Sequence, residues 1–207
     1  MNAMMKHNAV SAVKTKILFI RHAESESNAG GRSSDPATIP LSKQGIAQAE
    51  ALALSLSAKP SLVVTSRYIR TKQTASPALK RFSEIPHEEW DTHEFTYLSP
   101  AKCKNTTSSE RLPMVQAYWD RCDPFYCDGE GAESFSDLIN RAHQAIDKLK
   151  RLEHRHVAVF SHEQFIKAVL WLIGGDRTPL DSEKMKSFRQ VLLIDRIPNC
   201  GKVEVAL

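Results

Sequence analysis

The chain has 207 residues, of which 42% are hydrophobic and 25% are charged, a composition typical of a globular protein with one substantial core. Its net charge of +4 suits an anionic ligand, but no basic run of the length expected for nucleic-acid binding occurs, so nucleic acid is excluded as a partner. The segment before residue 16 has no continuous apolar core, so we expect neither a signal peptide nor a membrane span.

The cysteines do not indicate a metal site. No Cys-x-x-Cys pair or zinc-ligand spacing occurs among the four, which are Cys103, Cys122, Cys127 and Cys200. Free thiols in a reducing compartment are the simplest interpretation, so we expect a cytoplasmic protein with no metal and no cofactor. We also expect residues 1–15 to form a flexible arm and residues 16–207 to form one domain, while no pattern indicates the oligomeric state.

The first third of the chain predicts a strand followed by a helix. Lys16 to Ile20 is a short apolar run with β-branched and aromatic residues, which indicates a buried strand. A polar loop rich in glycine and proline follows. Ser42 is then a good N-cap for an alanine- and leucine-rich helix that we expect to end at Pro60.

The middle of the chain repeats this alternation and then becomes irregular. Ser61 to Thr65 predicts a second buried strand, and Arg70 to Phe82 predicts a helix that Pro77 should kink or interrupt. Residues 86–131 follow no regular period and carry scattered aromatic residues. We interpret this segment as an insertion that forms a lid or wall over the site described below.

The last third predicts two helices and three strands. The amphipathic helix that begins at Ser134 has Asp137 at the capping-box position. A buried helix is predicted over Phe165 to Ile173, ended by the glycines that follow it. The predicted strands are Val157 to Ser161, Val191 to Ile194 and Lys202 to Leu207. The alternation of strands and helices predicts an α/β fold, with a mostly parallel central sheet flanked by helices in a single three-layer domain.

Polar residues capable of chemistry follow three of the predicted strands. These groups are Arg21-His22, then Ser66 with Arg67 and Arg70, then Ser161-His162-Glu163. Since open α/β sheets bind ligands at the carboxyl ends of their strands, we expect the three groups to converge. Two arginines and two histidines in one crevice suit a dianionic phosphoryl group, because guanidinium forks match its oxygens.

One of these histidines can act as a nucleophile. If His22 is neutral, one ring nitrogen can attack phosphorus in line and carry the phosphoryl group. The other nitrogen then needs a partner, which we expect to be a backbone carbonyl. The competing interpretation is a zinc enzyme, because His162-Glu163 and His93-Glu94 both begin like a His-Glu-x-x-His zinc-binding helix. Both lack the second histidine of that motif, since Ile166 and Tyr97 occupy its position. No phosphate-binding P-loop sequence is present.

Four spaced motifs resemble the histidine phosphatase, or phosphoglycerate mutase-like, superfamily, in its phosphoglycerate mutase-type branch. They are Arg21-His22-Ala23-Glu24-Ser25-Glu26-Ser27-Asn28, Leu41-Ser42-x-x-Gly45-x-x-Gln48-Ala49, Ser66-x-x-x-Arg70-Thr71-x-Gln73-Thr74-Ala75, and Ser161-His162. Glu94 resembles the acidic residue of the family's insertion, and residues 131–134 resemble its Gly-Glu-Ser segment with one residue added. The resemblance covers residues 16–207 in the family's order.

The resemblance implies a role for each matched residue. His22 would accept the phosphoryl group, and Glu94 would protonate the leaving oxygen and then activate water. A phosphate clamp is implied at Arg21, Arg70 and His162. Contacts to the substrate are expected at Asn28, Ser42 and Glu163.

The sequence departs from the family pattern at two positions. Ala23 replaces the usual glycine, which is harmless if its φ angle is negative. Glu163 replaces the glycine after the second histidine, and in the acid-phosphatase branch a carboxylate at this position is the proton donor. Because the Arg-x-Pro of that branch is absent, we favour Glu94 over Glu163.

The sequence therefore predicts a metal-independent phosphomonoester hydrolase that acts through phosphohistidine on a small phosphorylated substrate. A phosphoglycerate mutase-type phosphotransferase is the first alternative, although such mutases are usually longer in the insertion. The second alternative is a catalytically idle binder of phosphorylated ligands.

Overall fold

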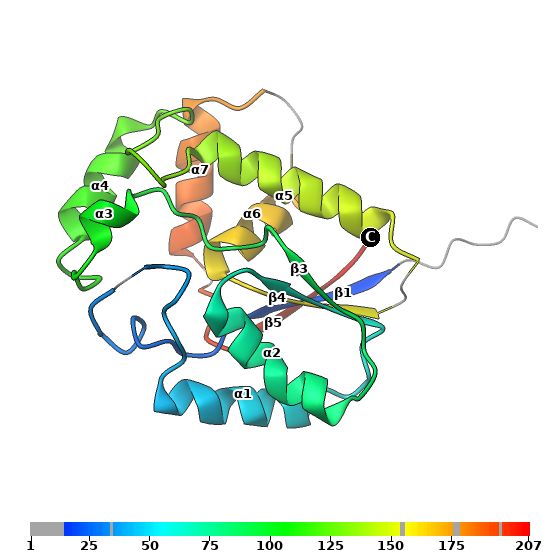
Figure 1. Cartoon of the computed structure of the whole chain (residues 1–207). Helices are drawn as coiled ribbons and strands as arrows, with labels where there is room; N and C mark the ends of the chain where they lie inside the picture. The colour runs from blue at the N-terminus through cyan, green and yellow to red at the C-terminus, as the bar shows by residue number, and fades with distance from the viewer. Residues whose placement is uncertain (1–14, 34, 154–155, 176–178, 195) are drawn as a thin grey trace, which may run out of the picture.

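A five-stranded sheet forms the centre of the fold, in the order β3-β2-β4-β1-β5 (Figure 1). The computed structural model describes residues 15–33, 35–153, 156–175, 179–194 and 196–207. The strands are β1 (Lys16–Arg21), β2 (Leu62–Ser66), β3 (His87–Trp90), β4 (His156–Ser161) and β5 (Lys202–Ala206). The first four run parallel and β5 is antiparallel to β1. The predicted fold class, with a mostly parallel sheet, is therefore confirmed.

Helices cover both faces of the sheet (Figure 1). One face packs on α1 (Lys43–Ser55) and α2 (Ile69–Arg81), and the other on α5 (Phe135–Lys150), α6 (Glu163–Gly174) and α7 (Ser182–Leu193). Side chains alternate along β1, so that Ile20 enters the first of these layers while Ile17 and Phe19 enter the second. The short α3 (Pro100–Cys103) and α4 (Leu112–Arg121) lie beside the layered core.

The two predicted N-caps, Ser42 and Ser134, are confirmed. The Ser42 side chain caps α1 by accepting a hydrogen bond from the Gly45 amide. Ser134 and Asp137 form a reciprocal capping box at α5. These caps supply partners for backbone N–H groups that the first helical turn leaves without acceptors.

The prediction of a strand over Val191 to Ile194 is wrong. These residues end α7, whose N-cap Asp181 accepts a hydrogen bond from the Lys184 amide. The buried residues Met185, Phe188 and Leu192 follow helical spacing. A run of four apolar residues resembles a strand, but here it is the last turn of an amphipathic helix.

The segment 86–131 is more regular than predicted. It begins with β3, an edge strand whose sequence His-Glu-Glu-Trp is exposed except at the last residue. An exposed edge strand lacks the apolar alternation by which strands are recognised. One prediction about a proline is corrected, because α1 already ends at Ser55, before Pro60. At Pro77, α2 is not interrupted, and the kink that this proline should cause stays a prediction.

The strand register brings the predicted site residues to one edge of the sheet. Arg21 at the end of β1 is paired with Ser161 at the end of β4, and Thr65 of β2 is paired with Phe160. The residues that follow these positions include both histidines of the motifs. The convergence expected from the sequence is thus confirmed.

The expected N-terminal arm lies, apart from Thr15, outside the described residues. Thr15 exchanges two backbone hydrogen bonds of 3.1 Å with Leu207, which extends the pairing of β1 with β5 by one residue. Across the described ranges, every helix is too short or too polar to span a bilayer.

Candidate active site

His22 follows β1 and is only 3% exposed. Its Nδ1 lies 2.7 Å from the carbonyl oxygen of Ala23. Because a carbonyl oxygen can only accept, Nδ1 carries the ring proton and Nε2 keeps its lone pair. Burial and the nearby charge of Arg70 hold the pKa of His22 well below 6.5, so the imidazole is neutral. This is the tautomer that a nucleophilic Nε2 requires.

The backbone around His22 is held from two other elements. The Thr74 hydroxyl, on α2, accepts a hydrogen bond of 3.0 Å from the Ala23 amide. The Asn199 side chain donates one of 3.0 Å to the His22 carbonyl. Neither role was predicted from the sequence, because both partners lie far from His22 along the chain.

The motif around Ser42 holds the loop after His22 through contacts with Glu24. The Ser42 hydroxyl donates a hydrogen bond of 2.6 Å to the Glu24 carboxylate, and Gln48 accepts one of 2.9 Å from the Glu24 amide. A Cβ at Gly45 would lie 1.9 Å from the Glu24 carbonyl oxygen, so only glycine permits this approach. Ser42 therefore positions the loop, and the structure does not bring it into the pocket expected to hold substrate.

Arg70 joins the two motif histidines. Its Nε donates to His22 Nε2 at 3.1 Å, Nη2 to His162 Nδ1 at 3.0 Å, and Nη1 to the Pro36 carbonyl at 2.7 Å. Burial lowers the pKa of Arg70 to about 10, so it remains a cation at neutral pH. The guanidinium is thus fixed beside the lone pair of His22.

His162 is fully buried, with its ring centroid 5.0 Å from that of His22. Since Nδ1 accepts from Arg70, Nε2 carries the proton and donates to the Ser66 hydroxyl at 2.8 Å. Burial and the charge of Arg70 lower the pKa of His162 well below 6.5. The sequence placed Ser66 near the site but did not predict that it orients this histidine.

Glu94 lines the same pocket as His22 and Arg70. Its Oε1 accepts hydrogen bonds from the backbone amides of Phe95 (3.0 Å) and Gln164 (3.2 Å). Burial raises the pKa of Glu94 above 4.5, in spite of these bonds and of the charges of Arg70 and Arg21. The raised pKa favours the protonated carboxyl, which is the form that a general acid needs.

Glu163 forms ion pairs with two arginines, Arg21 and Arg196. Its oxygens contact Arg196 at 2.6 and 2.9 Å and Arg21 at 3.2 Å, and Oε1 also accepts from the Ile197 amide at 3.1 Å. The residue does not line the pocket. This geometry supports Glu94 over Glu163 as the proton donor and gives Glu163 no contact with the pocket.

Arg21 lies beside the pocket rather than in its wall. Its Nη1 donates to the Ile197 carbonyl at 2.5 Å and pairs with Glu163. Its charge still reaches the site, since it helps to lower the pKa of His22. Within the described part of the chain, the buried Nε of Arg21 has no hydrogen-bond partner.

The pocket has a volume of about 280 Å³. Asn28 lines it, and its Oδ1 accepts hydrogen bonds from Ser25 and Asn199.

The segment between β3 and α5 forms another part of the pocket wall, as expected for residues 86–131. Its action as a lid stays a prediction. That part includes Tyr97, Leu98, Cys103, Ser108, Arg111 and Val115. The sequence did not single out Arg111, which is a lone arginine in a polar stretch.

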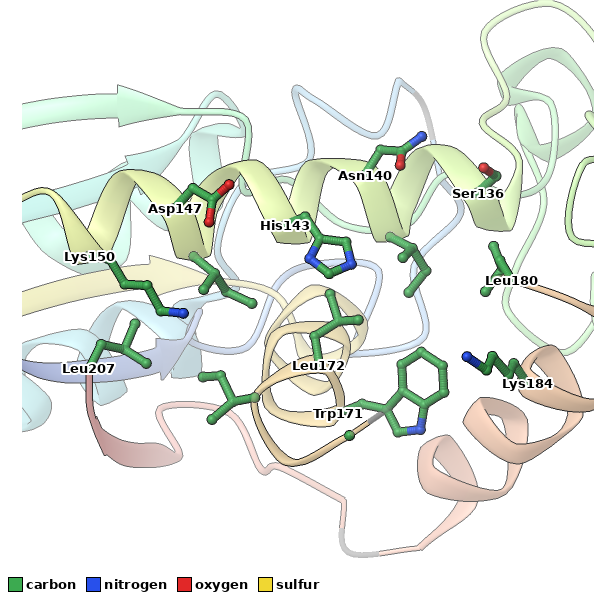
Figure 2. Close-up of a pocket in the computed structure, with 14 residues that line it drawn as sticks. Ser136, Asn140, His143, Asp147, Lys150, Trp171, Leu172, Leu180, Lys184 and Leu207 are labelled. Atoms are coloured by element: carbon green, nitrogen blue, oxygen red, sulfur yellow. The ribbon is translucent and has the colours of Figure 1, made fainter. Parts of the chain in front are cut away.

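A larger cavity, of about 670 Å³, lies between α5, α6 and α7 (Figure 2). His143, Asp147 and Lys150 from α5 face Trp171 and Leu172 from α6 across it. None of the residues of the four motifs lines this cavity. We therefore assign the candidate active site to the smaller pocket.

Comparison with known proteins agrees with this assignment. A family model described as "Histidine phosphatase superfamily (branch 1)" matches residues 17–190. The chain matches no curated protein sequence.

Several solved structures share the fold. The alpha-ribazole phosphatase of Shigella flexneri has a TM-score of 0.70 and 20% identity, with 92% of this chain and 89% of that chain covered. A mycobacterial glucosyl-3-phosphoglycerate phosphatase has a TM-score of 0.69 and 21% identity, with 92% of each chain covered. A variant phosphoserine phosphatase of Entamoeba histolytica, in complex with phosphoserine, has a TM-score of 0.68 and 20% identity, with 92% and 89% covered.

The site predicts that both histidines stay neutral in mild acid. Their pKa values lie well below 6.5 because burial and Arg70 oppose a second positive charge. Nitrogen NMR of ring-labelled protein should show Nδ1–H in His22 and Nε2–H in His162, without titration between pH 7 and about pH 6. Protonation of either ring near its ordinary pKa would contradict the described geometry.

Proposed function

Because the chain belongs to the histidine phosphatase superfamily (branch 1), we propose that it is a metal-independent phosphomonoester hydrolase that forms a phosphohistidine at His22. Membership of the superfamily supports a phosphatase or a phosphotransferase. The single observation that carries the proposal is the hydrogen bond from His22 Nδ1 to the Ala23 carbonyl, which leaves Nε2 unprotonated in a pocket that also holds Arg70 and Glu94. This arrangement supplies a nucleophile, a cation and an acid.

In the first step, Nε2 of His22 attacks phosphorus as the bond to the leaving oxygen breaks. Glu94 transfers its proton to that oxygen, so the product leaves as an alcohol and Glu94 becomes a carboxylate. Arg70 stabilises the charge on the transferring phosphoryl oxygens, because its donors already face Nε2. His162 accepts a hydrogen bond from Arg70 and so fixes its guanidinium, while Arg21 adds a second positive charge near His22.

In the second step, water attacks the phosphorus of the phosphohistidine. The Glu94 carboxylate takes a proton from that water, the P–N bond breaks, and its electron pair returns to Nε2. Inorganic phosphate is released, and both His22 and Glu94 recover their starting protonation states. The same two groups thus serve both halves of the cycle.

The substrate is expected to be small. A cavity of about 280 Å³ accommodates a phosphoryl group with a short organic portion. The similar structures are phosphatases of alpha-ribazole phosphate, glucosyl-3-phosphoglycerate and phosphoserine, whose organic portions differ widely. A shared fold therefore does not select among them.

The experiment that tests the proposal is hydrolysis of an aryl phosphate with a metal chelator present. Wild type should release phosphate, and His22→Ala should reduce kcat by about a thousandfold or more, because no other group carries the phosphoryl intermediate. A well-folded wild type that is inactive on the aryl phosphate but transfers phosphate between phosphoglycerate isomers would show a mutase instead. Ligand binding without either reaction would indicate an idle binder.

Replacement of the two carboxylates tests the proton donor. Glu94→Gln should lower kcat/KM by about 10²- to 10⁴-fold for alkyl phosphates, and much less for nitrophenyl phosphate, whose leaving oxygen needs no proton. Glu163→Gln removes a partner of Arg21 and Arg196, and should affect both substrate types equally. The opposite pattern would make Glu163 the acid.

The pH profile gives a second readout for Glu94. Because its pKa is raised, the acid form persists above pH 4.5, and activity on alkyl phosphates should fall as pH rises through the shifted value. On the acidic side of the profile, activity should fall only well below pH 6.5, because the lowered pKa of His22 delays its protonation. Glu94→Gln should remove the basic limb, and a basic limb that survives this change would assign it to another group.

A further inference from the structure

The buried carboxylate of Glu163 lies between two arginines. Glu163 is the first residue of α6 and directly follows His162. An acidic residue is common in the first turn of a helix, because the helix dipole favours negative charge there. Here, however, the carboxylate contacts Arg21 at the end of β1 and Arg196 near the C-terminus. The stability of α6 alone therefore does not explain this side chain.

Arg21, Glu163 and Ile197 contact one another in a closed triangle. Nη1 of Arg21 lies 3.2 Å from Oε2 of Glu163 and donates to the Ile197 carbonyl at 2.5 Å. The Ile197 amide in turn donates to Oε1 of Glu163 at 3.1 Å. Only 12% of the Arg21 side chain and 8% of the Glu163 side chain are exposed. Because water hardly reaches these contacts, they hold the guanidinium of Arg21 firmly in one orientation.

The triangle leaves the other edge of the Arg21 guanidinium free. Both contacts of Arg21 within the triangle use Nη1. The buried Nε has no hydrogen-bond partner within the described ranges, and the same ranges supply none for Nη2. Nε–H and one Nη2–H point in the same direction and form a fork that matches two oxygens of an anion. A buried donor without an acceptor is costly, so this free fork requires an explanation.

Arg21 lies within electrostatic reach of the groups proposed to act on phosphate. Burial is the largest cause of the shifted pKa values of His22, Arg70 and Glu94, and the charge of Arg21 contributes to each of them. Arg21 is nevertheless not part of the pocket wall. A free guanidinium fork beside His22 suits the oxygens of a phosphoryl group that is bound to this histidine.

We propose that Glu163 is a positioning residue, which holds Nη1 of Arg21 so that Nε–H and Nη2–H are free to bind the transferring phosphoryl group. This inference rests on the proposed function of the same site. Glu163 does not touch the substrate and acts only through Arg21. The glycine that is usual at this position has no side chain with which to hold the arginine.

The test measures the affinity for inorganic phosphate by calorimetry in wild type, Glu163→Gln, Arg21→Met and the double variant. If charge alone mattered, the loss of a carboxylate would strengthen the binding of an anion. We expect the opposite in Glu163→Gln, a weakening by about fivefold or more, because a neutral amide holds the guanidinium less firmly. In the Arg21→Met background, the same change should leave the affinity unchanged or raise it.

This difference between the two backgrounds separates positioning from a general structural role. Equal losses in both backgrounds would overturn the proposal, as would unchanged or tighter binding in Glu163→Gln alone. Because removal of one partner of a buried ion pair can unfold a protein, Glu163→Asp provides a second variant. It keeps the charge but is shorter by one methylene group, so it should also weaken phosphate binding, and wild-type affinity would contradict the proposal.

Two control variants test the other contacts. Arg196→Met removes the exposed partner of Glu163 and leaves the triangle intact, so phosphate affinity should change less than threefold. A loss as large as that of Glu163→Gln would assign Glu163 to anchoring the C-terminal segment instead. Asp128→Asn is the matched control, because Asp128 is similarly buried and pairs with Lys102 at 2.7 Å outside the pocket wall. It should bind phosphate like wild type, and an equal loss there would overturn the proposal.

Binding of phosphate requires no turnover, which separates this inference from the proposed function. A protein that hydrolyses no ester but shows the expected difference between the two backgrounds would support the role of Glu163 while refuting the hydrolase. Hydrolysis that depends on His22, together with equal effects of Glu163→Gln in both backgrounds, would refute only the role of Glu163.

Discussion

The site depends on one guanidinium, that of Arg70, which contacts both histidines through separate nitrogens. Each contact requires an unprotonated ring nitrogen, so the arginine and the histidines determine each other's protonation. His22 completes its hydrogen bonding through the Ala23 carbonyl, and His162 through the Ser66 hydroxyl. Three parallel strands make this possible, because their carboxyl ends place the three residues at the same edge of the sheet.

The centre of the site could be predicted from the sequence for a physical reason. Short buried strands and the polar residues that follow them are local signals, and parallel strands must align their carboxyl ends. The capping residues Ser42 and Ser134 could be predicted in the same way, since a cap is a contact over three residues. What local pattern could not give is the direction in which a side chain points. Ser42 matches a family motif and Glu163 directly follows the second histidine, yet both face the supporting structure rather than the pocket.

The parts that were missed depend on long-range contacts or on weak local signals. β3 is an exposed edge strand, and the apolar end of α7 resembles a strand when it is considered alone. Arg111 carries no sequence signal, because its place in the pocket wall depends on partners at Ser33 and Thr106. Asn199 likewise reaches His22 only through the fold. These features lie where the periodicity of the sequence carries little information.

The central claim is that His22 carries the phosphoryl group, and trapping the intermediate tests it most directly. Wild type mixed with an aryl phosphate and quenched rapidly in alkali should contain a phosphoryl group on His22, attached at Nε2 and lost on acidification. Peptide mass spectrometry locates the group, and phosphorus NMR distinguishes the two ring nitrogens. Phosphate found on another residue, or turnover with no phosphoenzyme under conditions that trap a known phosphohistidine, would contradict the account.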